Sequence, residues 1–229
     1  MAISINNCYG IGYRCNTDDF MKGLCIRQYS SPFSYMVCDL ETSIQFIENE
    51  FLDFLNVTYV PDHNFYWNGN IWDHKLYFNN RFKPYKYEGE INKEKRICVW
   101  NHHDLNNSII ADSIKRRYLR LLDADKISNI LYIYIENIQN YYTENWENYF
   151  SKEIILNFIA NRTNRYVLLL LPLINFNSDP VLYKINKYLN VIFYESNTDG
   201  TINDYDNPNI KWNKVQYLVL QNYSFDAHA

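Results

Sequence analysis

The stretch Ile130–Ile135, ILYIYI, decides the fold class, because six consecutive apolar or aromatic residues leave no polar face on a strand. A second run of this kind, YVLLLL, occupies residues 166–171, and segments with helical spacing of apolar residues alternate with such runs. Strands that are apolar on both faces and alternate with helices are typical of a parallel sheet that is covered on both sides. The sequence therefore predicts an α/β fold, a three-layer sandwich with a mostly parallel sheet.

The neighbouring segments extend this order toward both ends of the chain. Helical spacing of apolar residues predicts helices, and short apolar runs predict strands. We expect the first strand, which leads to Cys8, to join the same sheet as the others. The helices are predicted at residues 43–55, 108–122, 142–159 and 180–189, and the further strands at residues 3–5, 97–100, 191–194 and 215–220.

The chain of 229 residues is the size of one generous domain, and the sequence contains no internal repeat or domain boundary. Residues 59–95 are crowded with aromatic residues and lack a sustained period, so we expect an irregular insertion there. Residues 197–211 are expected to form a surface loop. Asp123-Ala124-Asp125, at the end of the predicted helix 108–122, is expected to be a solvated turn.

Composition and charge exclude several classes of function. The formal net charge of −4 argues against a nucleic-acid partner, because nucleic-acid-binding proteins usually carry a basic excess. No basic start is followed by an apolar segment of the signal-peptide type, and the longest apolar run, residues 166–174, is too short to cross a membrane. We therefore expect a cytoplasmic protein without a membrane span; its oligomeric state is left open.

The cysteines and histidines give no support for a metal or a cofactor. Five cysteines are present without a CxxC pair, which argues against a disulfide framework and a zinc ribbon and predicts reduced thiols. His102 and His103 are adjacent, so their side chains would point in opposite directions in an extended segment. No HExxH motif, phosphate-binding loop or GxGxxG motif is present. The prediction is no metal and no cofactor.

Cys8 is the first candidate for chemistry. A strand that runs through a polar turn into a helix would leave Cys8 near a helix N-terminus. Free backbone N–H groups and the helix dipole would favour the thiolate there, and the same groups could hold an oxyanion during acyl transfer. The alternative is that Cys8 is a small buried hydrophobic residue, which free cysteines usually are.

Polar clusters are expected at the carboxyl ends of three strands, where ligands gather in open α/β sheets. A cysteine and a histidine that met at this edge would form a nucleophile–base pair, with a carboxylate to orient the imidazole. His103 could instead be a structural residue near a helix N-terminus, hydrogen-bonded to the backbone. The clusters are Asn6-Asn7-Cys8, Asn101-His102-His103-Asp104 and Glu136-Asn137.

Four polar residues are candidates for substrate binding. Asn6 and Asn7 directly precede Cys8. Arg116 and Arg117 lie on the predicted helix 108–122, where they would form either a solvated face or a site for an anionic substrate.

Several motifs, in order, resemble a family of papain-like cysteine peptidases that occurs in bacteria and large DNA viruses, often near genes for surface polysaccharides. The resemblance covers about the first 135 residues and implies Cys8 as nucleophile and His103, or His102, as general base. The motifs are ISINNC ending at Cys8, GLCIR at 23–27, SSPFSY at 30–35, HHD at 102–104, IKRRYLRLL at 114–122 and ILYIY at 130–134.

The leading functional hypothesis is a cysteine-nucleophile hydrolase or acyl transferase that acts on a peptide or another acyl substrate. Cys8 would attack the acyl carbon, His103 would accept the thiol proton, and Asp104 or Glu136 would orient His103. One alternative is a glycosyltransferase or accessory protein of surface-glycan synthesis, because aromatic faces such as those in residues 59–87 can stack on sugars. Another is a binding module without catalysis, in which all three clusters are structural.

Overall fold

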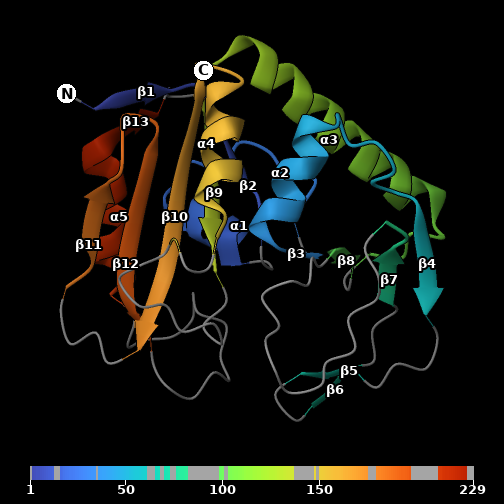
Figure 1. The fold of residues 1–229 in the computed structure, drawn as a ribbon. Coiled ribbons are helices and arrows are strands. Elements are labelled where there is room, and N and C mark those ends of the chain that lie inside the picture. Colours follow the sequence, from blue (N-terminus) through green and yellow to red (C-terminus); the bar gives the residue numbers. More distant parts are fainter. Residues whose placement is uncertain are drawn as a thin grey trace.

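A five-stranded sheet lies at the centre of the computed structural model of the chain (Figure 1). The strand order is β11-β12-β10-β9-β2, and all neighbours pair in parallel except β11, which is antiparallel to β12 at one edge. The predicted α/β sandwich with a mostly parallel sheet is therefore confirmed. The strands are β2 (Asn7–Gly10), β9 (Ile130–Ile135), β10 (Arg165–Ile174), β11 (Val181–Lys184) and β12 (Leu189–Ser196). The structure describes residues 2–12, 16–34, 36–60, 65–67, 70–72, 76–81, 98–100, 103–136, 147, 150–174, 179–196 and 211–225.

Helices cover both faces of the central sheet. Alternate residues of β9 belong to two different core clusters, and all six are buried. One cluster includes side chains of α2 (Leu40–Glu48), α3 (Ser108–Ile127) and α4 (Lys152–Ala160). The other includes side chains of α1 (Asn16–Gly23) and α5 (Trp212–Asn222). The ILYIYI run is apolar throughout because each of its faces packs against a helical layer.

A second sheet is antiparallel and lies outside the central one. Its strand order is β3-β8-β7-β4, with β3 (Met36–Cys38), β8 (Cys98–Trp100), β7 (Leu76–Asn79) and β4 (Val57–Val60). The prediction that the strand at residues 97–100 joins the sheet of Cys8 is therefore wrong. Two-stranded pairs are formed by β1 (Ile3–Ile5) with β13 (Tyr223–Phe225), and by β5 (Phe65–Trp67) with β6 (Asn70–Trp72).

Two elements near the carboxyl terminus differ in type from the prediction. Residues 181–184 form the edge strand β11 instead of a helix, because they pair with β12. Residues 215–220 belong to α5 instead of a strand, and its buried residues Trp212, Val215 and Val219 recur at helical spacing. Other apolar residues of this helix, such as Tyr217 and Leu220, are exposed.

Helix ends are set by local caps. The α2 helix begins earlier than predicted because the side chain of Asp39 accepts a hydrogen bond from the Thr42 N–H at 2.8 Å. It ends at Glu48, before Glu50 and Phe51, whose φ angles are positive at 50° and 59°. The helix predicted at 142–159 is described from Lys152, with Ser151 as its N-cap. Most of residues 59–95 and of 197–211 lie outside the described part of the chain.

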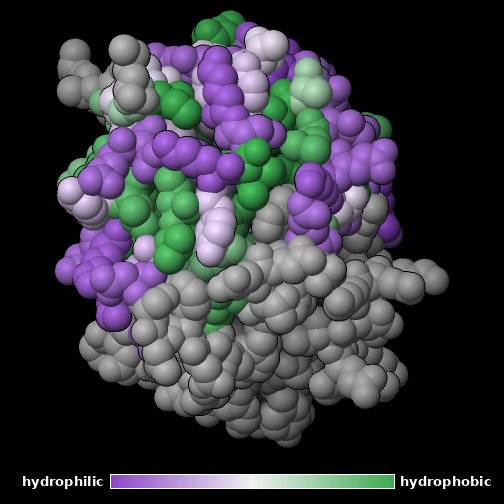
Figure 2. Space-filling model, turned by 60° about the vertical axis from the view of Figure 1, so that its left-hand side comes forward, coloured by the Kyte–Doolittle hydropathy of each residue, from purple (hydrophilic) through white to green (hydrophobic). Residues whose placement is uncertain are grey.

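The side of the molecule with β11 and α5 carries a mixed surface. Figure 2 turns this side forward and shows hydrophobic side chains in strips between hydrophilic ones, above a region drawn in grey. Val181 and Tyr183 of β11 are among the exposed large hydrophobic residues. Within the described ranges, no helix is both long and apolar enough to cross a bilayer.

Candidate active site

Cys8 lies inside strand β2, not in a turn before a helix. The strand that enters the central sheet is Asn7–Gly10, whereas Ile3–Ile5 pairs with β13 instead. In the parallel register Cys8 lies opposite Leu131 of β9. The predicted location of Cys8 at a helix N-terminus is therefore wrong.

The surroundings of Cys8 favour the neutral thiol. Its side chain is 2% exposed, and its Sγ lies 3.5 Å from the Sδ of Met21 on α1. Burial, and to a smaller extent the negative charge of Asp18, raises the pKa of the Cys8 thiol well above its ordinary value. A thiolate at Cys8 would be desolvated and would face a carboxylate.

Helix α1 begins beyond the carboxyl end of β2. Gly10 ends the strand and Asn16 begins the helix. The first N–H groups of a helix have no partner within the helix, and the helix dipole places partial positive charge there. Cys15 directly precedes Asn16 in the sequence and lies outside the described residues. The environment that the sequence suggested for Cys8 therefore lies at the start of α1 instead.

Asp18 is a buried carboxylate in the first turn of α1. Its side chain is 2% exposed and receives a hydrogen bond from Arg27 Nη2 at 3.2 Å. Burial raises the pKa of Asp18, and this effect outweighs the opposing influence of the nearby Ser34 side chain and of the charges of Arg27 and Lys22. Sequence reasoning missed Asp18, because an acidic residue in a first helical turn is common for reasons unrelated to a site.

The loop at residues 30–34 is linked by hydrogen bonds to β2 and, through Arg27, to α1. Ser31 Oγ donates a hydrogen bond of 2.6 Å to the carbonyl oxygen of Gly10, the last residue of β2. Arg27 Nη2 also contacts Ser30 Oγ at 2.6 Å, in addition to Asp18. The SSPFS motif is therefore a connection between the carboxyl end of β2 and the first turn of α1.

His103, which follows strand β8 of the second sheet in the sequence, contacts this loop. Its Nε2 lies 3.3 Å from the carbonyl oxygen of Ser34. A carbonyl only accepts hydrogen bonds, so this contact assigns the proton to Nε2 and leaves Nδ1 as the nitrogen that can accept one. The same contact fits the structural alternative for His103, a hydrogen bond to the backbone. His102 and Asn101 lie outside the described residues.

Asp104 is held by the second sheet. Its Oδ1 accepts hydrogen bonds from the Tyr77 hydroxyl of β7 and from the Asn106 N–H. The Tyr77 ring lies 5.3 Å, centroid to centroid, from the ring of Tyr59. The side chains of the other aromatic residues on which the glycan hypothesis depends lie outside what the structure describes.

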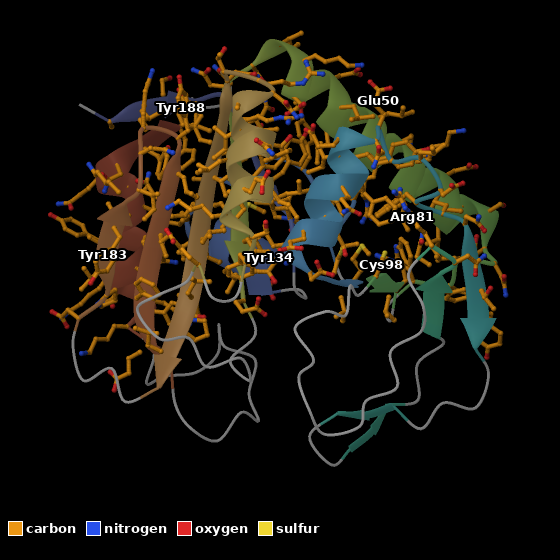
Figure 3. All side chains as sticks on the ribbon, viewed as in Figure 1. Glu50, Arg81, Cys98, Tyr134, Tyr183 and Tyr188 are labelled. Carbon is orange, nitrogen blue, oxygen red and sulfur yellow. The ribbon has the colours of Figure 1, made fainter. Side chains whose placement is uncertain are left out.

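Glu136 lies at the carboxyl end of β9, at the edge of the sheet where the sequence placed it. It is buried, and its Oε2 accepts a hydrogen bond of 2.7 Å from the Tyr134 hydroxyl. Gly12 packs on the ring of Tyr134, since a Cβ there would lie 2.0 Å from Cδ2. The chain that leaves β2 therefore passes directly over Tyr134, which Figure 3 labels. Asn137 lies outside the described residues.

The four predicted substrate-binding residues lie on two other parts of the fold. Asn7 Nδ2 donates to Ser128 Oγ at 2.8 Å, and Asn6 Oδ1 accepts from the Asn129 N–H at 3.0 Å. Both contacts are at the amino end of β9, so the expected position of Asn6 and Asn7 at the carboxyl edge is wrong. Arg116 is exposed and Arg117 half-buried on α3; their binding of a substrate stays a prediction.

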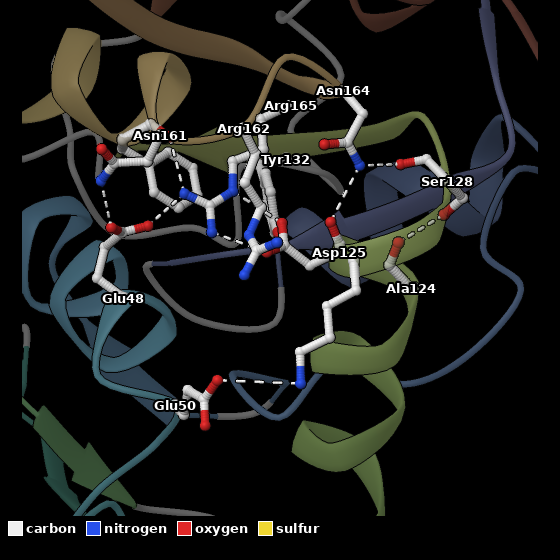
Figure 4. Close-up of polar contacts among 12 residues, drawn as sticks. Glu48, Glu50, Ala124, Asp125, Ser128, Tyr132, Asn161, Arg162, Asn164 and Arg165 are labelled. Carbon is white, nitrogen blue, oxygen red and sulfur yellow. Dashed lines mark hydrogen bonds and ion pairs between the residues drawn. The ribbon is translucent and has the colours of Figure 1, made fainter.

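An ion-pair network at the amino ends of β9 and β10 was not predicted (Figure 4). Arg165 donates from Nε and Nη2 to the two carboxylate oxygens of Asp125 at 2.8 and 2.7 Å, and Nη1 pairs with Glu48. Arg162 Nε and the Tyr132 hydroxyl also reach Asp125, at 3.0 and 2.7 Å. Asp125 is 2% exposed, so the expectation of a solvated turn is wrong.

The charges of Arg165, Asp125 and Glu48 attract one another, and we call this ion-pair network the clamp. Burial lowers the pKa of the Arg165 guanidinium, but the hydrogen bonds and charge of Asp125 outweigh this effect and raise it. A polar cavity of about 320 Å³ lies beside the clamp, and three acidic and three basic side chains line it together with Ile47, Leu122 and Asn161. Opposite charges in equal number leave no net attraction for an ion. The charged lining residues are Glu48, Glu50, Asp125, Lys126, Arg162 and Arg165.

Among the described residues, no group of three or more His, Cys, Asp or Glu side chains could hold a metal ion. The four described cysteines, at positions 8, 25, 38 and 98, are free thiols.

Comparison with known proteins identifies a family. No curated protein and no solved structure matches the chain. A family described as "Putative papain-like cysteine peptidase (DUF1796)" matches residues 7–148, which is more than half of the chain. This region contains β2, α1, the loop at residues 30–34, His103 and β9, and the match confirms the resemblance inferred from the motifs. The chain belongs to this family.

Proposed function

We propose that the chain is a cysteine-dependent hydrolase or acyl transferase, with Cys15 as nucleophile and His103 as general base. One observation carries the proposal. His103 Nε2 lies 3.3 Å from the carbonyl oxygen of Ser34, at the end of the loop that is bonded to β2 through Ser31 and to Asp18 of α1 through Ser30 and Arg27. His103 is thereby held beside the helix that begins directly after Cys15.

The other cysteines are poorer candidates. Cys8 is buried, and its thiol pKa is raised. Cys38 and Cys98 are buried in the second sheet. Cys25 is exposed but follows the end of α1, where no unpaired helix N–H groups could hold an oxyanion. A cysteine that directly precedes a helix has such N–H groups beside it, and this environment in general lowers a thiol pKa.

The chemistry follows from these positions. Nδ1 of His103 takes the proton of the Cys15 thiol, and the sulfur attacks an acyl carbon of the substrate. N–H groups of the first turn of α1 stabilise the oxyanion. His103 returns the proton to the leaving amine or alcohol as the acyl bond breaks. Water, or an acceptor in a transferase, then attacks the thioester and releases the thiol.

Two carboxylates are proposed to support His103. Asp104 is the next residue in the chain and is itself fixed by Tyr77, so it can limit the motion of the imidazole. Glu136 lies at the carboxyl edge of the central sheet with its side chain held by Tyr134. A peptide or another acyl compound is the proposed class of substrate.

A single-turnover experiment with p-nitrophenyl acetate tests the proposal. Mixing the full chain with this activated ester should release nitrophenolate in a burst and leave an acetyl group on Cys15, detected by mass spectrometry of the digested protein. Cys15→Ala and His103→Ala should abolish the burst, whereas Cys25→Ala should retain it. An acetyl group on Cys8, or equal slow acetylation of Cys15 and the exposed Cys25, would refute the assignment. The latter result would favour a binding module without catalysis.

A further inference from the structure

Cys38 and Cys98 face each other across the second sheet. Strands β3 and β8 pair antiparallel, and in their register Cys38 lies directly opposite Cys98. The two residues are 60 positions apart in the sequence, so no spacing motif brings attention to them. The fold alone makes them a pair.

The geometry of the pair suits a covalent bond. Directly opposed residues of antiparallel strands have Cα atoms about 4.5–5.5 Å apart. Disulfides in proteins join cysteines whose Cα atoms are about 4.4–6.8 Å apart. The Cys38 thiol lies close enough to that of Cys98 to raise its pKa. A bond between the two sulfurs therefore requires little movement of the backbone.

The pair lies in an apolar environment. Cys38 and Cys98 are 0% and 2% exposed and belong to the core cluster that includes Trp100. Ser43 Oγ donates to Cys38 Sγ at 3.2 Å. Burial, and then the neighbouring Cys38 thiol, raises the pKa of the Cys98 thiol. The two thiols therefore stay reduced in the folded chain, and they react only when strands β3 and β8 separate locally.

We propose that Cys38 and Cys98 are a modification site that takes up an intramolecular disulfide from a low-molecular-weight disulfide such as oxidised glutathione. The thiolate of one cysteine attacks a sulfur of glutathione disulfide and releases one glutathione thiolate. The second cysteine, as thiolate, attacks the protein sulfur of the mixed disulfide and releases the other. The two cysteines lose two protons and two electrons, and one glutathione disulfide becomes two glutathione thiols.

The disulfide would join the two segments that meet at His103. Strand β3 begins two residues after Ser34, and β8 ends three residues before His103. A disulfide between the two strands would therefore keep Ser34 close to His103 even when the hydrogen bonds between β3 and β8 break. The modification itself does not require that Cys15 or His103 take part in catalysis.

Disulfide mapping tests this inference. The reduced full chain is incubated with mixtures of oxidised and reduced glutathione, its remaining thiols are trapped with N-ethylmaleimide, and a digest made without reductant is examined by mass spectrometry. We expect a peptide pair linked through Cys38 and Cys98 whose amount rises with the share of oxidised glutathione. The exposed Cys25 should instead carry glutathione. Cys98→Ser should remove the linked pair without producing a new one.

A second incubation distinguishes two reasons why the disulfide could fail to form: glutathione disulfide reaches the buried thiols too slowly, or Cys38 and Cys98 do not form a disulfide at all. The incubation is repeated in urea below the unfolding transition, which promotes local opening of strands while the chain remains folded. Linkage that appears more rapidly there supports the inference. Cys38 and Cys98 that are still trapped as thiols, or that are linked to other cysteines, would overturn it. Acetylation of Cys15 by p-nitrophenyl acetate is measured separately, so failure of one proposal is distinguishable from failure of the other.

Discussion

Replacing Arg165 with methionine should remove the centre of the ion-pair network. Methionine keeps the unbranched apolar stem of the side chain but has no donors. The change breaks both hydrogen bonds to Asp125, the ion pair with Glu48 and a hydrogen bond of 2.7 Å to the carbonyl oxygen of Phe158. It also removes a guanidinium that lies 4.1 Å from the centre of the Phe158 ring.

The expected loss follows from what remains around Asp125. Breaking a buried ion pair by removing one partner costs about 3–5 kcal/mol, because the other charge stays buried without compensation. Asp125 keeps its contacts with Arg162 and the Tyr132 hydroxyl, so we expect the lower end of this range, about 3 kcal/mol. For a chain of this size that corresponds to a decrease in Tm of about 6–12 °C.

Urea unfolding followed by circular dichroism measures the change in the free energy of unfolding. Arg116→Met is the matched control, because Arg116 is exposed on α3 and its replacement should change stability by less than about 0.5 kcal/mol. Adding Asp125→Asn to Arg165→Met should restore part of the lost stability, since the uncompensated charge is removed. A loss below about 1 kcal/mol for Arg165→Met would refute the clamp, because that is the range of exposed ion pairs.

Three further predictions concern the other parts of the fold. Burial holds the pKa of Asp18 above 3.8 in the folded chain, so the folded state binds more protons than the unfolded state above that pH. Stability should therefore fall as the pH rises from 3.8 through the raised pKa, and Asp18→Asn should flatten this slope in urea titrations at several pH values. A slope unchanged in the variant would contradict the pKa shift. Gly12→Ala places a Cβ 2.0 Å from the Tyr134 ring and should cost about 1–3 kcal/mol in the same assay; no loss would mean that the chain does not pass over Tyr134 there. A disulfide between Cys38 and Cys98 closes a loop of about 60 residues and should stabilise the oxidised chain by about 4 kcal/mol on the chain-entropy account, seen as a higher Tm that reductant reverses; an oxidised chain with an unchanged Tm would count against it.

The fold class was predictable because the decisive runs are long and unambiguous. ILYIYI at 130–135 has no polar face, and the stripe Ile114, Leu121 and Leu122 of α3 is buried as its spacing indicates. Short apolar runs were not decisive. Residues 215–220 have the composition of a strand, and only the spacing of Trp212, Val215 and Val219 distinguishes the helix. Residues 181–184 form a strand because β12 offers them an edge, which the local sequence does not reveal.

The candidate site was predictable in part. The sequence placed Glu136 at the carboxyl end of its strand, but it took Ile3–Ile5 as the first strand of the central sheet and therefore placed Cys8 wrongly. The pairing of Asn7–Gly10 with β9 is a long-range contact, and an asparagine followed by a cysteine gives a weak strand signal. The contact between Ser34 and His103 joins residues 69 positions apart, so it also needs the fold.

The most direct test of the account is the pH dependence of Cys15 alkylation by iodoacetamide, resolved by site with mass spectrometry. In the wild-type chain Cys15 should react at a pH well below the free-thiol pKa of about 8.5, and Cys8 should react only on unfolding. His103→Ala should remove the reactivity of Cys15 at low pH, whereas His228→Ala, which changes a histidine at the far end of the chain, should leave it unchanged. Cys15 that titrates like the exposed Cys25, with no effect of His103→Ala, would contradict the thiolate–imidazole pair and with it the proposed catalytic role.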